Sequence, residues 1–141
     1  MYLNKANLFL VISICLIFFF LTYNDVKSQE PKIISGIANV VDGDTIRLNG
    51  KKIRFTGIDT PELKQTCIKK GIKDFCGLNA KQILADKIAN NTVKCISEGK
   101  DQYKRTLAEC FVNNESLSRY LVRSGYAFAY RKYSNKFIKD E

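Results

Sequence analysis

The sequence predicts an α+β domain that follows a short leader. Three observations carry this prediction: strand-like segments in the first half, one amphipathic helix in the middle, and two more strands followed by helical sequence. Strands first, then a helix, two strands and helices is the order of an α+β fold, not of alternating α/β units. Five strands with one inserted helix are compatible with a small barrel, although the pattern alone does not select one.

The first thirty residues differ from the rest of the chain. Residues 1–5 carry one positive charge, residues 8–21 are almost entirely apolar, and residues 22–30 are polar, which is the order of a secretory signal peptide. The apolar run is shorter than the ~20 residues that a membrane-spanning helix needs. We therefore expect a signal peptide over 1–28 and a secreted or periplasmic domain over 29–141. The alternative is an uncleaved membrane anchor formed by the apolar run.

The predicted strands begin directly after the leader. Residues 33–41 are rich in Ile and Val, and both Thr45–Leu48 and Ile53–Thr56 alternate between apolar and polar side chains. Between these two segments, Asn49-Gly50 is a strong signal for a two-residue hairpin turn. The strand then ends at Asp59-Thr60-Pro61, because proline has no N–H to donate to a ladder.

A helix and two further strands follow. Residues 63–77 are expected to form a loop that carries two cysteines, and residues 80–90 a helix. The apolar face of that helix consists of Ala80, Ile83, Leu84 and Ile88. Val93–Ile96 and Thr106–Val112 read as strands joined by a polar loop. A last helix is predicted over 115–124, with Asn114 as its cap and Gly125 as its stop.

Composition narrows the classes of partner and chemistry. The chain has 23 Lys and Arg against 14 Asp and Glu, a net charge of +9, and the part after residue 28 keeps +8. A basic surface favours polyanions such as nucleic acid or anionic lipid, and the alternative is a solvated basic face. The chain has no His, which excludes Ser-His and Cys-His catalysis and every His-based metal site.

Four cysteines fall after the leader, namely Cys67, Cys76, Cys95 and Cys110. An even count behind a signal peptide suggests two disulfides. A zinc site is the competing interpretation, but the spacings contain no Cys-x-x-Cys pair and no His is present to complete a ligand set.

Two acidic clusters bracket the first hairpin, Asp42-Gly43-Asp44-Thr45 and Asp59-Thr60-Pro61-Glu62. Taken singly, each is typical of a turn with solvated carboxylates. Strands of one meander can bring the end of one beside the start of another, so Asp44 and Asp59 are candidates to share a hard cation such as Ca²⁺. Glu62 would then lie near the cation but outside its shell, where a carboxylate can take a proton from water.

Phosphodiester hydrolysis also needs positive charge on the phosphate oxygens as the transition state forms. Arginine supplies it in a bidentate form and does not lose its proton. Arg54 lies on the strand that leads into Asp59, and Arg105 opens a later strand. Either arginine alone is more simply read as a surface residue, since long basic side chains normally lie at the surface.

Taken together, Asp42-Gly43-Asp44-Thr45, Arg54-x4-Asp59-Thr60-Pro61-Glu62 and Asp101-x-Tyr103-x-Arg105 resemble the staphylococcal nuclease (thermonuclease) family in order and spacing. The resemblance runs from about Ile33 to Tyr133, and the cysteine arrangement is similar to that of a secreted bacterial branch with four cysteines. The resemblance implies an OB-fold, a five-stranded β-barrel with two to three helices.

The same resemblance implies an activity and the residues for it. Members of the family are calcium-dependent endonucleases that hydrolyse DNA and RNA by attack of water on phosphorus and leave 3′-phosphate ends. The matching positions are Asp44, Asp59 and Thr60 for calcium, Glu62 for the general base, Arg54 and Arg105 for the phosphate, and Tyr103 for contact with the nucleotide.

Two departures from the family pattern bear on this expectation. The family usually has glycine where Lys104 stands, and a side chain there would either alter the turn that aims Arg105 or add a contact to phosphate. Family members also usually continue through a C-terminal helix, whereas this sequence stops at Glu141 without any Trp. We therefore expect that the helix is dispensable here or that the product is shortened and less stable.

For the disulfides, we expect Cys67–Cys76 to close the loop before the helix and Cys95–Cys110 to join two strands of a hairpin. A Cys67–Cys110 link, or four free thiols, would contradict this expectation.

Three functions compete at this stage. The first is a monomeric nuclease, the second is an OB-fold protein that binds nucleic acid without cutting it, and the third is an envelope or interaction protein whose membrane contact is the leader. The presence of Glu62 together with Arg54 and Arg105 favours the enzyme, because binding alone needs no general base.

Overall fold

A computed structural model describes residue 14 and residues 31–141 of the chain. The signal peptide or anchor predicted over residues 1–28 lies, apart from residue 14, outside the described residues. Within the described part, no helix combines the length and the apolar character needed to cross a membrane.

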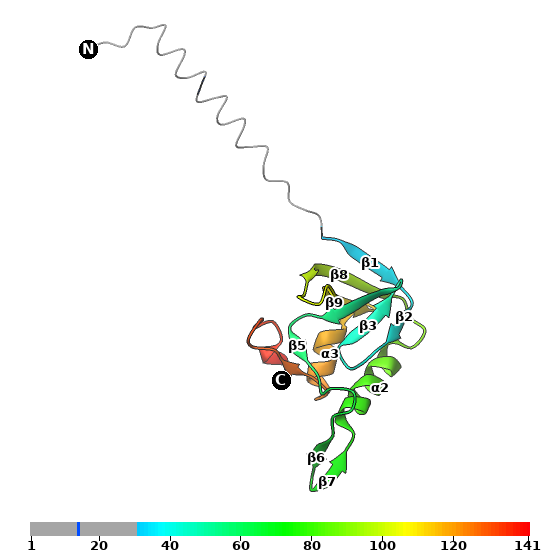
Figure 1. Ribbon diagram of the computed structural model, residues 1–141, viewed down its shortest axis with the longest axis vertical. Coiled ribbons are helices and arrows are strands. Elements are labelled where there is room, and N and C mark those ends of the chain that lie inside the picture. The colour runs from blue at the N-terminus through cyan, green and yellow to red at the C-terminus, as the bar shows by residue number, and fades with distance from the viewer. Residues whose placement is uncertain (1–13, 15–30) are drawn as a thin grey trace, which may run out of the picture. The chain divides into compact units, whose positions relative to one another are not determined.

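The main sheet forms a near-closed barrel (Figure 1). Its strands are β1 (Ile33–Gly36), β2 (Ala38–Val40), β3 (Thr45–Leu48), β4 (Lys51–Phe55), β8 (Val93–Lys100) and β9 (Thr106–Val112), in the order β1-β8-β9-β4-β3-β2. Because only Ile37 separates β1 from β2, these two are halves of one bent strand that supplies both ends of the sheet. Counted in this way the barrel has five strands, so the predicted α+β OB-fold is confirmed.

The predicted hairpin between β3 and β4 is confirmed in its register and its turn. Ile46 pairs with Ile53, and both are fully buried. Asn49 and Gly50 have φ of 50° and 75°, the left-handed values that a two-residue hairpin turn requires at both positions. The hairpin therefore buries one face, and its strand β4 carries Arg54, which lines the pocket described below.

The helices lie where the periodicity placed them, with different boundaries. Helix α2 (Cys76–Ile88) starts four residues earlier than predicted and buries Ala80, Leu84 and Ile88. Helix α3 (Leu117–Arg123) is capped by Ser116, whose Oγ accepts from the backbone N–H of Arg119 at 3.3 Å. The predicted cap at Asn114 is wrong, because residues 115 and 116 pair with β9 as the short strand β10 (Glu115–Ser116) before the helix begins.

The expected loop over residues 63–77 contains a hairpin instead. β6 (Cys67–Lys69) pairs with β7 (Ile72–Asp74), and the turn between them is Lys70-Gly71, with φ of 51° and 79°. Strand β8 also runs to Lys100, beyond the predicted end at Ile96, with a bulge near Ser97. The sequence pattern misses the β6–β7 hairpin because neither of its faces is buried.

Short elements close the fold around the barrel. β5 (Ile58–Asp59) pairs with β11 (Phe128–Ala129), and a 3-10 turn, η1 (Ile138–Asp140), follows near the end of the chain. Phe137, directly before η1, is fully buried, and Asp140 forms ion pairs with Arg119 and Arg123 of α3. The residues that follow β11 are therefore held to the barrel through α3.

The structure contains both expected disulfides, Cys67–Cys76 and Cys95–Cys110. Cys95 and Cys110 are direct partners in the β8–β9 ladder, while the other bridge ties the base of the β6–β7 hairpin to the start of α2. Disulfides of this kind are typical of proteins outside the reducing cytoplasm.

Candidate active site

Arg54 bridges Asp44 and Asp59, the two carboxylates predicted to bind a metal ion. Its two terminal nitrogens donate to Asp44 Oδ1 and to Asp59 Oδ1, each at 2.7 Å. The strands set this arrangement: Arg54 pairs across the ladder with Thr45, the residue after Asp44, and Asp59 ends β5 a few residues beyond β4. Two carboxylates that lie ten and five residues from the arginine are thereby brought to one guanidinium.

The two carboxylates have different surroundings. The side chain of Asp44 is only 4% exposed, whereas that of Asp59 is 54% exposed. Burial raises the pKa of Asp44 to about 6; Arg54 opposes this rise, and the negative charges of Asp42 and Asp59 add to it. Asp44 therefore loses its proton at a higher pH than an ordinary aspartate, and further positive charge beside it would favour its ionised form.

Gly43 brings the Asp44 loop against Thr60. A Cβ at Gly43 would lie 2.7 Å from Thr60 Oγ1 and 2.9 Å from the Cβ of Ala80, so only glycine permits this approach. Asp44, Asp59 and Thr60 consequently form one neighbourhood of oxygen atoms, which is the ligand type that Ca²⁺ prefers. Among the described residues no group of three Asp, Glu, Cys or His side chains could hold a metal. A cation here would take further oxygens from the backbone or water.

Glu62 lies on the loop after β5, and its backbone is held from two sides. Its N–H donates to Gln65 Oε1 at 3.0 Å, while its carbonyl accepts from Gln65 N–H at 2.7 Å. On the other side, a Cβ at Gly77 would lie 1.8 Å from the carbonyl oxygen of Glu62, so helix α2 touches this loop directly. No hydrogen bond or ion pair to another described residue involves its exposed carboxylate, which is therefore available to water or a ligand.

Asp101 builds the turn that presents Arg105. Its Oδ1 accepts from the backbone N–H groups of Tyr103 and Arg105, both at 2.9 Å, and its Oδ2 accepts from Arg105 Nε at 2.6 Å. Burial opposes ionisation of Asp101, but the hydrogen bonds from Arg105 outweigh it and hold the pKa of this carboxyl below its ordinary value. The Arg105 guanidinium lies 5.5 Å from the ring centre of Tyr103, which is 71% exposed.

Lys104 has a φ of 63°, the left-handed conformation that favours glycine. The turn that aims Arg105 is thus formed with lysine at the position where glycine is usual, at a cost in backbone strain. The Lys104 side chain is exposed and does not line the pocket described next.

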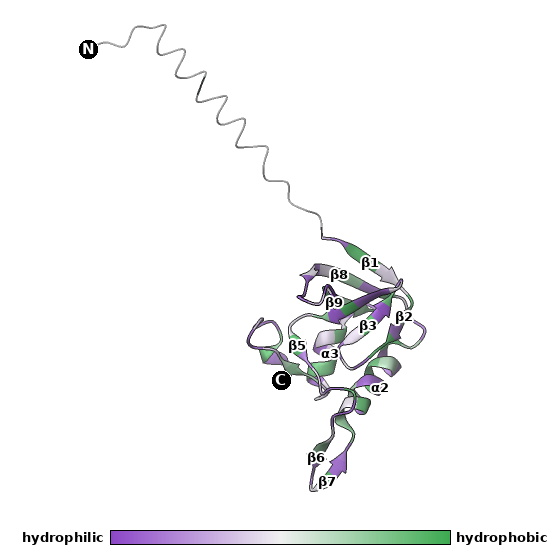
Figure 2. Cartoon of the chain, viewed as in Figure 1, coloured by the Kyte–Doolittle hydropathy of each residue, from purple (hydrophilic) through white to green (hydrophobic). Residues whose placement is uncertain are grey.

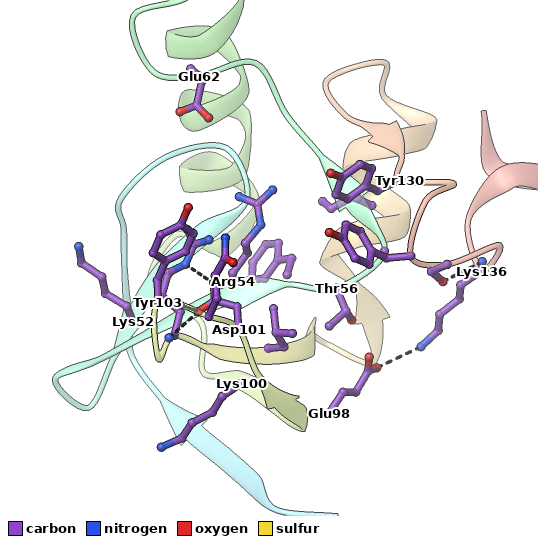
Figure 3. Close-up of a pocket in the computed structure, with 18 residues that line it drawn as sticks. Lys52, Arg54, Thr56, Glu62, Glu98, Lys100, Asp101, Tyr103, Tyr130 and Lys136 are labelled. Atoms are coloured by element: carbon purple, nitrogen blue, oxygen red, sulfur yellow. Dashed lines mark hydrogen bonds and ion pairs between the residues drawn. The ribbon is translucent and has the colours of Figure 1, made fainter.

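A pocket of about 1060 Å³ brings four of the predicted residues together: Arg54, Glu62, Tyr103 and Arg105. Figure 3 shows Glu62 at one end of this space, with Arg54 and Tyr103 below it and Tyr130 across from them. The lining holds five basic side chains against three acidic ones. Asp44, Asp59 and Thr60 do not line the pocket; Arg54 connects the two carboxylates to it.

Part of the pocket lining was not predicted from the sequence. Lys52 and Lys100 lie on its basic side, and Tyr130 and Tyr133 lie opposite, with ring centres 4.9 Å apart. Thr56 lines the pocket as well, and its Oγ1 is a buried side-chain oxygen without a hydrogen-bond partner among the described residues. The Tyr-x-x-Tyr spacing was a visible signal for the aromatic wall, whereas nothing in the sequence marked Thr56.

Comparison with known proteins agrees with this geometry. A sequence model of the family described as "Staphylococcal nuclease homologue" matches residues 52–141. The match includes most of the candidate residues but begins after Asp44.

Individual relatives share about a third of their aligned residues with this chain. It is 34% identical over 107 residues to the succinoglycan biosynthesis protein ExoI of Rhizobium meliloti, covering 74% of this chain and 55% of that protein. It is 31% identical over 104 residues to an uncharacterized endonuclease of Haemophilus influenzae, covering 70% and 53%. With endonuclease YncB of Bacillus subtilis the identity is 30% over 127 residues, covering 82% and 59%. The chain thus spans between half and three fifths of the length of these relatives.

Proposed function

Since this chain belongs to the staphylococcal nuclease family, we propose that it is a calcium-dependent endonuclease that hydrolyses phosphodiester bonds of DNA or RNA and leaves 3′-phosphate ends. One observation supports the proposal: the same basic pocket is lined by two arginines, Arg54 and Arg105, and by Glu62, whose carboxylate is exposed. Two of the relatives described above are named endonucleases, which supports the same activity.

Asp44, Asp59 and the backbone carbonyl of Thr60 would hold the calcium ion. The fit is supported by the Asp44 carboxylate, whose pKa is raised mainly by its burial, and by the close approach of Gly43 to Thr60. When bound, the ion would supply positive charge beside the scissile phosphate and make a nearby water more acidic. In the described structure Arg54 forms ion pairs with both carboxylates, and its single positive charge offsets only one of their two negative charges.

Glu62 would act as the general base. Its carboxylate is exposed to the pocket while its backbone is fixed by Gln65 and α2, so it can accept a proton from an attacking water without reorganisation of the loop. A positioned base of this kind contributes about 10²–10⁴-fold to a rate.

The two arginines would stabilise charge on the phosphoryl oxygens. Asp101 takes only the Nε of Arg105, which leaves the planar terminal fork for a phosphate. Arg54, once relieved of its carboxylate partners, would bind the same phosphate from β4, the strand that pairs with β9. Tyr103 and Tyr130 line the same space and offer aromatic faces to the adjoining bases.

The proposed cellular location rests on the disulfides and on the leader predicted from the sequence. We propose that the protein is a monomer and that it is secreted or periplasmic; the two disulfides support this location, because such bonds form and persist in oxidising compartments. Such a location would bring the enzyme into contact with extracellular or periplasmic nucleic acid.

The decisive experiment is plasmid cleavage by the wild type and by Glu62→Gln, with Ca²⁺ and with chelator. We expect cleavage by the wild type in Ca²⁺ alone, and a loss of kcat of about 10²-fold or more in the variant with nucleic-acid affinity preserved. Asp86→Asn, on the exposed face of α2, is the charge-matched control and should cut normally.

Two results would overturn the proposal. Full activity in chelator would remove the calcium requirement. Binding of nucleic acid by the wild type without any cleavage would instead identify a non-catalytic OB-fold binding protein.

A further inference from the structure

We propose that the β6–β7 hairpin is an arm that grips B-form duplex DNA beyond the pocket, in addition to the contacts of the scissile phosphate. The inference rests on the proposed function, since it assigns to the same site a preference for a long DNA duplex. In Figure 1, β6 and β7 extend past α2, away from the barrel.

The arm is exposed over nearly its whole length. Residues 68–73 are all exposed, and Ile68 and Ile72 keep 73% and 72% of their surface accessible. The two strands are paired in register, closed by the Lys70-Gly71 turn and bridged at the base by Cys67–Cys76. The hairpin is therefore a two-stranded ribbon tied to α2 at its base, by Cys67–Cys76 and by the Asn79–Asp74 hydrogen bond, with residues 68–73 exposed beyond it.

Its charge is complementary to a phosphate backbone. Lys69, Lys70 and Lys73 are exposed, and the one acidic residue of the hairpin, Asp74, accepts a hydrogen bond from Asn79 at 2.8 Å. Three lysines on six consecutive residues present a concentrated positive charge at the tip. Each lysine that meets a phosphate releases condensed counterions from the nucleic acid.

The arm is continuous with the pocket. Gln65, two residues before β6, forms hydrogen bonds with both the backbone N–H and the backbone carbonyl of Glu62. The carbonyl of Gln65 accepts a hydrogen bond from Gly77 N–H at 3.2 Å. Glu62 lines the pocket. A nucleic acid whose phosphate lies beside Glu62 is therefore directed past the base of the arm.

The length of the arm sets the length of substrate that can reach it. Lys70 lies five residues after Gln65, which corresponds to about 17 Å at ~3.3 Å per residue. At about 3.4 Å per nucleotide along one strand, the tip lies roughly five nucleotides from the reacting phosphate. A trinucleotide is therefore too short to touch the lysines of the tip.

Shape selects the kind of duplex. The major groove of B-form DNA, about 12 Å wide, admits a two-stranded β-ribbon. The major groove of an RNA duplex is deep and narrow, and side chains cannot read it. The exposed Ile68 and Ile72 would then lie against the apolar edges of the groove, where methyl groups offer contacts that water does not. Figure 2 shows hydrophobic and hydrophilic residues side by side on this hairpin.

The test compares two variants with the same net charge. In the arm variant, Lys69, Lys70 and Lys73 are replaced by Gln; in the control variant, the exposed Lys51, Lys94 and Lys139, which do not line the pocket, are replaced by Gln. Affinity for a 30-base-pair DNA duplex and its RNA counterpart is measured by fluorescence anisotropy in chelator at several salt concentrations. Cleavage of a labelled trinucleotide is measured in Ca²⁺.

We expect the arm variant to lose at least tenfold in affinity for the DNA duplex. The slope of log affinity against log salt should become shallower by about 2.7, which is three contacts at ~0.9 each. The control variant should keep the wild-type slope, RNA duplex affinity should change little, and trinucleotide cleavage should be unaffected.

Several outcomes would overturn the inference. Equal slopes for all three proteins would mean that the lysines only keep an exposed ribbon soluble, and slower trinucleotide cleavage would mean that the arm acts through Glu62. Binding of phosphatidylglycerol vesicles that depends on the arm, with unchanged DNA affinity, would assign it to an anionic lipid surface. If the wild type cleaves nothing while the arm variant still loses duplex affinity, the proposed nuclease activity is wrong, but the proposed binding of duplex DNA by the arm is supported.

Discussion

Replacing Gly77 with Ala tests whether helix α2 positions Glu62, the proposed general base. The φ of Gly77 is not in the left-handed region, so the cost of alanine there is steric and not conformational. Its Cβ would lie 1.8 Å from the carbonyl oxygen of Glu62 and 2.7 Å from the carbonyl carbon, both backbone atoms that cannot rotate away. Non-bonded carbon contacts relax at about 3.5 Å, so the loop must move by roughly 1.5 Å.

The size of this movement predicts the effect on catalysis. A displacement of about 1 Å in a catalytic group costs on the order of 10²-fold in rate, so we expect Gly77→Ala to lower the single-turnover rate by about 10²-fold or more. Overpacking would cost about 1–3 kcal/mol of unfolding free energy. The better helix propensity of alanine, about 1 kcal/mol, offsets part of that cost. The loss of activity should therefore be larger than the loss of stability.

The assay is single-turnover cleavage at saturating Ca²⁺, beside urea denaturation of the same preparation. Leu78→Ala, at the next position of α2 and 53% exposed, serves as the control and should change neither quantity. Wild-type rates in Gly77→Ala would refute the reasoning, because they would show that the position of the Glu62 backbone does not limit catalysis.

Three further predictions concern the turn that carries Arg105. Arg105→Lys keeps the charge but loses the bidentate fork, so the cleavage rate should fall roughly 10³-fold; a surface arginine would show almost no effect. Lys104→Gly should raise the free energy of unfolding by about 0.5–1 kcal/mol in denaturant titrations, because it relieves a φ of 63°, and lower stability would contradict this. The lowered pKa of Asp101 means that its ionised form stabilises the fold at pH above its ordinary value of 3.8 and that this contribution is lost as the pH falls through the folded pKa. Asp101→Asn should therefore be less stable than the wild type at pH 6, and the difference should shrink on acidification to pH 3.

The barrel could be predicted from the sequence because its strands have one buried face. The alternation in β3 and β4 and the turn at Asn49-Gly50 appear in the structure with the expected pairing. The start of α2 was missed for an identifiable reason: its cap position is Phe75, which makes no side-chain capping bond. Without a capping residue or a buried face, nothing local distinguishes residues 63–77 from a loop.

The candidate site was only partly predictable, for a different reason. The chemical type of a residue can be read from the sequence, so carboxylates and arginines in a recognisable order could be singled out before the fold was known. The contacts that hold them could not, because Gly43, Gln65 and Gly77 act through close approach and hydrogen bonds between distant segments. Tyr130 likewise joins the pocket only because β11 pairs with β5.

These contacts also show why the two halves of the proposed chemistry depend on each other. The segment from Thr60 to Glu62 lies between the Asp44 loop, which reaches it through Gly43, and helix α2, which reaches it through Gly77. One backbone segment thus carries a proposed calcium ligand at one end and the proposed base at the other. We expect a movement of α2 that displaces Glu62 to strain the contact between Thr60 and Gly43 as well. The distance between the proposed ion and the proposed base would therefore depend on the tight packing of two glycines against a short chain segment.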